Sequence, residues 1–185
     1  MNNDDDLIDG LVATLRNHDA YDRIESGHKY KTLRFLATVS APTDPEFYSP
    51  GHVVGSAFVV SVDFNRFALV RHKSLGRLLQ PGGHVDVLDQ TLAHTASREV
   101  QEELGLRSTS APADELFDID VHRIPVGVDW PSHLHFDFRY LLVANPSESN
   151  SVTAHWFAVV DIPNLSLDDG LKRMVSKCLR RGLLC

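Results

Sequence analysis

Three glutamates are the side chains in this sequence whose spacing could do chemistry. Glu99, Glu102 and Glu103 lie in a segment from Thr91 to Leu104 that contains neither proline nor glycine. Apolar residues recur there at every fourth position, which predicts a helix with one buried stripe. On a helix the three carboxylates share one face, where they repel one another unless a cation neutralises them. Hard oxygen donors of this kind suit Mg²⁺ or Mn²⁺, and a solvated acidic helix face is the alternative.

The segment before this helix can turn tightly and approach a ligand closely. Gly82 and Gly83 have no side chain to prevent a sharp turn or a close contact. Asp89 or Thr91 can cap the start of the helix, and Gly105 suits its end. The sequence therefore predicts a glycine loop that leads into a capped acidic helix.

Residues 81–106, PGGHVDVLDQTLAHTASREVQEELGL, resemble the signature of the Nudix (MutT-like) hydrolases. That signature is G-x5-E-x7-R-E-U-x-E-E-x-G-U, where U is aliphatic. Its second half matches from Arg98 to Leu106 at every specified position. In the first half, counting from Gly83 places Asp89 at the first glutamate, and eight residues rather than seven then precede Arg98. We predict a loop longer by one residue, in which Asp89 keeps the carboxylate as a ligand or as a support for one. A helix cap is the alternative role.

This resemblance implies an α/β fold of the α+β type, a Nudix α/β/α sandwich with a mixed sheet and an N-terminal helical extension. It also implies a Mg²⁺- or Mn²⁺-dependent hydrolase that cleaves a phosphoanhydride bond of a nucleoside diphosphate linked to another moiety. The metal ligands would be the three helix glutamates and the backbone carbonyl of Gly82, while Arg98 would orient a glutamate. Such enzymes take their catalytic base from the signature, where Glu99 is the candidate, or from a later strand.

A later segment, from His133 to Tyr140, alternates polar and apolar residues and is predicted to be a strand. One face would carry two histidines, a carboxylate and an arginine: His133, His135, Asp137 and Arg139. An ordinary half-buried strand has simple solvated residues on its polar face, so we interpret this row as a wall that binds the substrate. Asp137 or His135 is then a second candidate for the base. A structural polar network is the alternative.

Basic residues precede the glycine loop and could clamp phosphates. They are Arg71, His72, Lys73 and Arg77. We take Arg71 and Arg77 as candidate substrate-binding residues, with a solvated basic loop as the alternative.

The remaining pattern predicts strands before and after the acidic helix and further helices at both ends of the chain. The predicted helices cover residues 7–17, 30–39 and 171–181. The predicted strands cover residues 53–62, 67–70, 115–126, 134–143 and 155–160. We divide the single domain into an N-terminal helical accessory segment, 1–50, and a hydrolase core, 51–185.

Composition favours a small enzyme with one core and a small-molecule partner. The chain has 185 residues, 43% of them hydrophobic, and no linker rich in Pro, Gly and Ser divides it. Its net charge of -7 argues against nucleic acid as a partner, because no broad basic surface would release counterions from phosphates. No segment is long and apolar enough for a membrane, and the acidic start has no secretion signal, so we expect a cytoplasmic protein. The expected partner is a nucleotide or another diphosphate compound, and a homodimer is one assembly to test.

Two other functions share the predicted fold. An isopentenyl diphosphate isomerase would need a catalytic cysteine before the signature, yet the only cysteines are Cys178 and Cys185. These two have no metal-ligand spacing and are predicted to be free thiols in a reducing compartment. A ligand sensor would typically carry a degraded signature and a separate DNA-binding domain, whereas the three glutamates here are intact.

Overall fold

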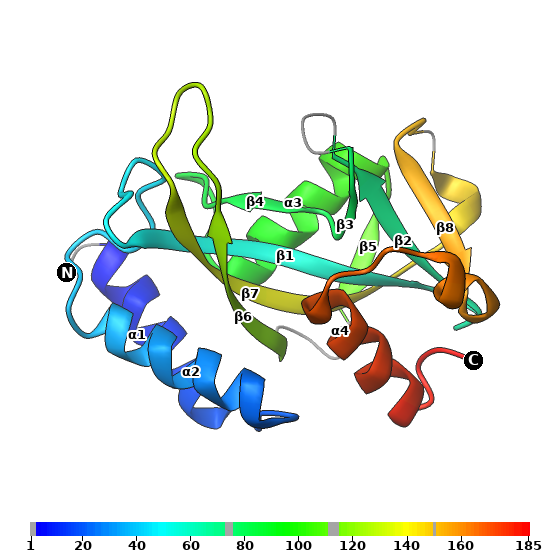
Figure 1. The fold of residues 1–185 in the computed structure, drawn as a ribbon, viewed down its shortest axis with the longest axis horizontal. Helices are drawn as coiled ribbons and strands as arrows, with labels where there is room; N and C mark the ends of the chain where they lie inside the picture. Colours follow the sequence, from blue (N-terminus) through cyan, green and yellow to red (C-terminus); the bar gives the residue numbers. More distant parts are fainter. Residues whose placement is uncertain (1–2, 73–75, 111–114, 150) are drawn as a thin grey trace.

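The described part of the chain, residues 3–72, 76–110, 115–149 and 151–185, forms a mixed sheet of eight strands with helices against it (Figure 1). This computed structural model contains the strands β1 (Gly51–Ser61), β2 (Arg66–Arg71), β3 (Leu78–Leu79), β4 (Gly82–His84), β5 (Ser108–Ser110), β6 (Leu116–Ile124), β7 (His133–Ala144) and β8 (Ala154–Ala158). Its helices are α1 (Asn3–Asn17), α2 (Arg23–Leu36), α3 (Leu92–Leu104) and α4 (Asp169–Arg180), with short 3₁₀ turns at Pro146–Glu148 and Val159–Asn164.

Strands β1 and β7 run in parallel and form the axis of the sheet. Their register extends from Gly51 opposite Leu134 to Ser61 opposite Ala144. Every residue of β1 is buried, as expected for a central strand covered on both faces. The order across the sheet is β3-β2-β1-β7-β5, while β4 pairs with β1, β6 with β7 and β8 with β2.

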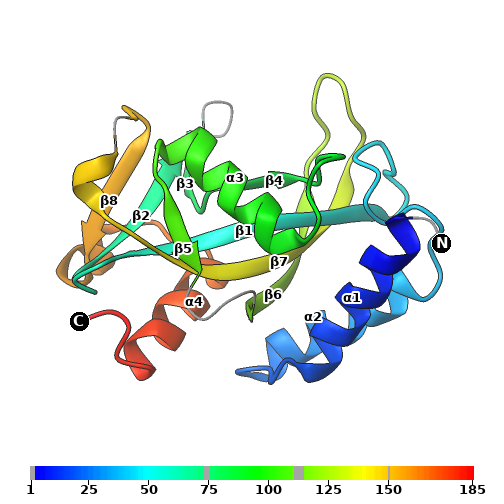
Figure 2. The same ribbon diagram turned by 180° about the vertical axis from the view of Figure 1, so that it is seen from behind.

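Alternate residues of β1 pack against different helices. Ala57 belongs to a hydrophobic core with Val100 of α3, whereas Phe58 belongs to a second core with Met174 of α4. Figures 1 and 2 show α3 and α4 on opposite faces of the β1–β7 pair. The sheet is therefore the middle layer of an α/β/α sandwich, which confirms the predicted fold class. No helix of the described residues is long and apolar enough to cross a membrane.

The N-terminal helices pack on the sheet, and the second one is longer than predicted. The ring of Phe35 in α2 stacks on Phe136 of β7, with centroids 3.9 Å apart. We predicted this helix at residues 30–39, but it begins at Arg23, because the side chain of Asp22 accepts a hydrogen bond from the N–H of Glu25. Its mostly polar first turns hide the apolar repeat that the prediction relied on.

The other predicted helices and strands are confirmed, with ends that move by a few residues. The strand predicted at 155–160 ends two residues early. It stops at Ala158, where the chain continues into the 3₁₀ turn that contains Pro163. The side chain of Asp161 accepts a hydrogen bond from the N–H of Ala158, which bends the chain into this turn.

Buried charges tie α2 and α4 to β6. Asp118 of β6 accepts hydrogen bonds from Arg173 (2.7 and 2.8 Å) and Lys177 (2.6 Å) of α4. Lys177 also donates to Glu25 of α2, and all four side chains are buried. Burial alone would raise the pKa of Glu25, but hydrogen bonds from His18 and Lys177 lower it to about 2. Ionised groups that are this well paired hold the two helices at defined positions on the sheet.

The network predicts a large loss of stability when its central carboxylate loses its charge. Asp118→Asn should lower the free energy of unfolding by about 3–5 kcal/mol, because it leaves two buried cations without their shared partner. Urea denaturation followed by circular dichroism measures this loss. The control is Lys172→Gln, which breaks an exposed pair with Asp169 and should cost about 0–1 kcal/mol. A loss for Asp118→Asn as small as that of the control would contradict the prediction.

Candidate active site

The acidic helix forms as predicted, and its cap is Thr91. The side chain of Thr91 accepts a hydrogen bond from the N–H of His94 at the start of α3. Gly105 ends the helix at φ 64°, in the left-handed region that glycine adopts without strain. The alternative that Asp89 caps the helix is therefore wrong.

Gly82 and Gly83 bring the backbone of β4 against two of the glutamates. The N–H of Gly82 donates a hydrogen bond to Oε2 of Glu103 at 3.1 Å. A Cβ atom on Gly83 would lie 2.3 Å from Oε1 of Glu99, far inside van der Waals contact. Only glycine permits this approach, and antiparallel pairing with β1 holds both glycines in place.

Arg98 connects the acidic helix to the loop that precedes it. Its Nη2 donates to Oδ2 of Asp89 at 3.0 Å and to the carbonyl oxygen of His84 at 2.8 Å. Its Nη1 donates to Oε1 of Glu99 at 2.8 Å and, at 3.4 Å, to the more exposed Glu102. One guanidinium thus holds a helix glutamate and the loop in the same arrangement.

Asp89 acts on the site through Arg98. The hydroxyl of Thr95 also donates to Asp89, at 2.9 Å. Burial alone would raise the pKa of Asp89, but hydrogen bonds from Arg98, from the backbone of Asp86 and from Thr95 lower it, so the carboxylate is ionised at neutral pH. This geometry supports the predicted role of Asp89 as a support for a ligand residue.

Glu99 and Glu103 lie in surroundings that disfavour negative charge. Burial raises the pKa of Glu103 to about 7, and the charges of Glu99 and Glu102 add to the increase. Burial also raises the pKa of Glu99, against the opposing effect of Arg98. Both carboxylates would therefore be stabilised by an additional cation.

The donor atoms fit a hard divalent cation. Three glutamates, with the carbonyl of Gly82 that the family resemblance adds, offer only oxygen, which Mg²⁺ and Mn²⁺ prefer. Burial and the neighbouring carboxylates both raise the pKa of Glu103, so a cation placed beside it would stabilise its charged form. A divalent ion would complete the charge balance there.

The polar row of β7 is not the open wall that its alternation predicted. His133, Asp137 and Arg139 are 4%, 1% and 2% exposed, while His135 is half-buried. Arg139 donates to Asp137 at 2.7 Å and to Asp120 of β6 at 3.2 Å. The structural polar network, given above as the alternative, describes these two residues.

The polar row of β7 is buried because neighbouring elements cover this stretch of the strand. Arg173 of α4 donates to Asp120 at 2.9 Å, so the helix closes the network from outside. Asp137 also accepts hydrogen bonds from Ser56 (2.6 Å) and Gln80 (3.1 Å). With its oxygens occupied, Asp137 is not placed to act as a base, and Arg139 is not placed to bind substrate. The alternating pattern could not distinguish a solvated face from a face covered by charged partners.

Sequence reasoning missed three histidines that gather around the two in the row. His52 of β1 lies opposite His135 in the sheet register, and their ring centroids are 4.9 Å apart. His84 and His122 each lie 5.6 Å from the ring of His135, and His133 lies 5.1 Å from it. Single histidines on separate strands have no spacing that a sequence could reveal, because only strand pairing brings them together.

The basic loop before the glycines borders a shallow pocket of about 220 Å³. Its lining residues are Arg71, His72, Gly76, Val152, Thr153 and His155. The hydroxyl of Thr153 donates to the backbone carbonyl of Glu103 at 2.8 Å, which places the pocket beside the end of α3. Arg77 is exposed and does not line the pocket, and Lys73 lies outside the described residues.

Similar folds occur in solved structures of low sequence identity. A hydrolase of the NUDIX family from Clostridium perfringens has a TM-score of 0.51 and 24% identity, covering 68% of this chain and 95% of that one. A C. elegans Ap4A hydrolase in a binary complex has a TM-score of 0.51 and 14% identity, covering 68% and 93%. The NUDIX domain of Shewanella oneidensis NrtR, complexed with ADP ribose, has a TM-score of 0.52 and 17% identity, covering 80% and 96%. No curated protein matches the sequence.

The NUDIX domain family matches residues 51–178, which is more than half of the chain. The chain therefore belongs to this family, and it is a Nudix hydrolase. The predicted family is confirmed. The matched range contains the glycines of β4, the acidic helix and both central strands.

The raised pKa of Glu103 predicts how one substitution changes stability with pH. Glu103 is protonated in both states below its ordinary pKa of 4.5, and between 4.5 and about 7 it is protonated only when folded. The folded state therefore loses stability as the pH rises through this window, and Glu103→Gln removes the loss.

In metal-free buffer at pH 8 the variant should melt about 2–4 °C higher than the wild type, with little difference at pH 4.5. Differential scanning calorimetry measures both, and equal melting temperatures at pH 8 would contradict the prediction. Glu148→Gln, at an exposed site, is the control.

The contacts of Arg98 predict a catalytic loss when Asp89 is neutralised. Asp89→Asn keeps the size of the side chain but removes the charge that pairs with the guanidinium, so the orientation of Glu99 weakens. We expect turnover to fall by about 10- to 100-fold, the usual range for a residue that supports a metal ligand. Steady-state kinetics at saturating Mg²⁺ measures this. Asp86→Asn, an exposed change in the same loop, should leave turnover unchanged, and equal rates in both variants would refute a supporting role for Asp89.

Proposed function

We propose that this Nudix hydrolase cleaves a phosphoanhydride bond in a nucleoside diphosphate linked to another moiety, and that it uses Mg²⁺ or Mn²⁺ held by Glu99, Glu102 and Glu103. The observation that carries the proposal is the packing of two half-buried carboxylates, Glu99 and Glu103, against the Gly82–Gly83 backbone. This arrangement gathers negative charge where the protein provides one nearby guanidinium. A divalent ion and the phosphates that it binds account for such a site.

Each residue of the site has a distinct task in this reaction. When bound, the divalent ion supplies an activated water and neutralises charge on the diphosphate. Arg98 holds Glu99 at 2.8 Å and keeps it aligned with the glycine backbone. Glu103 accepts the hydrogen bond of Gly82, which fixes its carboxylate beside the glycine backbone. We place the proton acceptor among the helix glutamates and not on Asp137 of β7, whose oxygens already accept hydrogen bonds from Ser56, Gln80 and Arg139.

The pocket beside the end of α3 is the candidate binding site for the far end of the substrate. Arg71 and His155 line it, and Thr153 connects it to the backbone of Glu103. Arg71 would pair with a phosphate, while the exposed Arg77 would add to the local positive charge. The similar structures of an Ap4A hydrolase and of a NUDIX domain with ADP ribose support a nucleotide as the substrate class.

The proposal predicts loss of activity when a glutamate ligand becomes an amide. Glu99→Gln or Glu103→Gln should lower kcat/KM by about 100-fold or more, because a neutral amide replaces a charged oxygen ligand of similar size. The assay is hydrolysis of a panel of nucleoside diphosphate compounds with Mg²⁺ or Mn²⁺, in which released phosphate and nucleotides are quantified. Glu148→Gln, a surface change, should keep wild-type activity.

Two outcomes of this assay would reject the proposal. Full activity of both variants at saturating metal would remove the glutamates from the mechanism. Tight binding of a nucleotide by the wild type, with hydrolysis of no compound in the panel, would favour the sensor function instead.

A further inference from the structure

A second group of donor atoms lies on the face of the sheet opposite the acidic helix. Gly55 of β1 faces α3, because a Cβ atom there would lie 2.8 Å from the carbonyl of Leu92. Side chains alternate along a strand, so His52 points to the other face, together with its partner His135 in β7. Gly83 of β4 faces Glu99 on the α3 side. The next residue, His84, therefore points to the same face as His52. The histidines and the glutamates therefore form separate sites.

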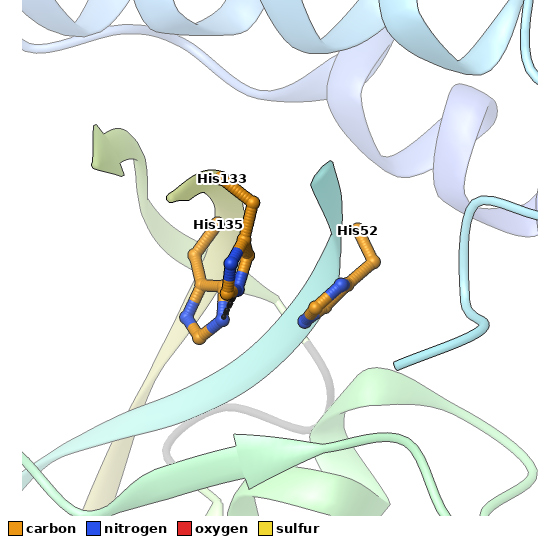
Figure 3. Close-up of side chains that lie close together, drawn as sticks. All are labelled: His52, His133 and His135. Carbon is orange, nitrogen blue, oxygen red and sulfur yellow. Dashed lines mark hydrogen bonds between the residues drawn. The ribbon is translucent and has the colours of Figure 1, made fainter. Parts of the chain in front are cut away.

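Three histidines of this group converge on one point. His52, His133 and His135 each offer a ring nitrogen, and these three atoms lie within 4.8 Å of one another. Among the described residues they are the only three histidine, cysteine or carboxylate groups that gather so closely. Figure 3 shows the ring of His52 turned toward the rings of His133 and His135.

Hydrogen bonds to the backbone set the tautomer of two of these rings. Nδ1 of His133 contacts the carbonyl of Pro131 at 2.8 Å, and Nδ1 of His52 contacts the carbonyl of Phe47 at 3.3 Å. A carbonyl oxygen can only accept, so Nδ1 carries the hydrogen in both rings. In the neutral ring Nε2 then presents a lone pair to the group. Metal-binding histidines commonly show this pattern, with the second nitrogen donating to a carbonyl.

His52 has a buried polar atom whose partner the protein does not supply. Its side chain is fully buried, and Nε2 has no hydrogen-bond partner. Burial, followed by the neighbouring His84, lowers the pKa of His52 to about 4, so the ring is neutral at physiological pH. Buried polar atoms are rarely left unpaired, so this nitrogen points to a ligand that binds there.

The spacing of the nitrogens suits a tetrahedral transition metal. Nε2 of His133 lies 3.2 Å from Nε2 of His135, where one ring donates a hydrogen bond to the other, and a bound metal would replace that hydrogen. Two nitrogens bound at about 2.0–2.1 Å to one tetrahedral Zn²⁺ are about 3.3 Å apart. The third nitrogen, from His52, lies within 4.8 Å of both, so this ring would move closer when the metal binds.

We propose that His52, His133 and His135 bind a divalent transition-metal ion of the Zn²⁺ class, at a site separate from the glutamate helix. Imidazole nitrogens favour Zn²⁺, Ni²⁺ and Cu²⁺ over Mg²⁺, which requires oxygen ligands. Three ligands leave a fourth position for water or an oxygen of a bound anion, as in zinc sites that do more than support the fold. The assignment does not depend on the reaction at the glutamates.

Zinc titration of matched variants tests the site. Metal-stripped full-length protein is titrated with ZnCl₂ by calorimetry in excess MgCl₂, which occupies the oxygen ligands. The wild type should bind one Zn²⁺ tightly, and His135→Ala or His52→Ala should weaken this binding about 100-fold or more, since each removes a direct ligand. His94→Ala, an exposed change on α3, and Glu103→Gln should both keep the tight site. Equal zinc binding by the wild type and both cluster variants would overturn the proposal.

A measurement on the wild type alone covers the case in which the buried His52 variant does not fold. X-ray absorption of the Zn²⁺-loaded protein should show nitrogen neighbours at about 2.0–2.1 Å with the scattering pattern of imidazole rings. Replacement by Co²⁺ should give the strong visible absorption of a four-coordinate ion. A shell of oxygen atoms without imidazole scattering would place the zinc at the glutamates and overturn the proposal.

Discussion

The parallel pairing of β1 with β7 is the interaction on which the rest of the structure depends. Its register places Gly55 beside Phe138 and His52 beside His135. Because side chains alternate along a strand, a slip of one residue would exchange the two faces of the sheet. A side chain would then occupy the space that Gly55 leaves for α3, and the histidines would point into the apolar core. The identity of both candidate sites therefore depends on this one ladder.

The two faces of the sheet offer different donor atoms. On the α3 side the carboxylates of Glu99 and Glu103 meet the glycine backbone, and on the other side three histidine rings meet one another. Oxygen and imidazole ligands select different cations. The sheet thus keeps the proposed Mg²⁺ or Mn²⁺ site and the proposed zinc site apart. Strand β4 contacts both groups, because Gly83 lies against Glu99 and the ring of His84 lies 4.9 Å from that of His52.

Buried ion pairs add specificity to a core that is otherwise apolar. Asp118, Arg173 and Lys177 join β6 to α4, while Glu25 extends the same network to α2. Each carboxylate of this network accepts hydrogen bonds from more than one cation or ring, so the cost of burying the charges is offset by short contacts. These pairs connect the N-terminal helices and the C-terminal helix, which are far apart in the sequence (Figure 1). The polar row of β7 ends in this network, which is why it is not open to substrate.

The sequence by itself determined the acidic helix, its end at Gly105, the fold class and the family. These features depend on residues that are close together along the chain. Apolar periodicity and the spacing of Glu99, Glu102 and Glu103 are local properties, and a helix converts spacing directly into a shared face. Tertiary structure alone decided the partners of Asp137 and Arg139, the role of Asp89 beside Arg98, and the meeting of His52 with His133 and His135. Those contacts depend on strand pairing and on which helix covers which face. An alternating strand shows that two faces differ, but the elements packed against it decide whether a face is solvated, buried or able to bind a metal.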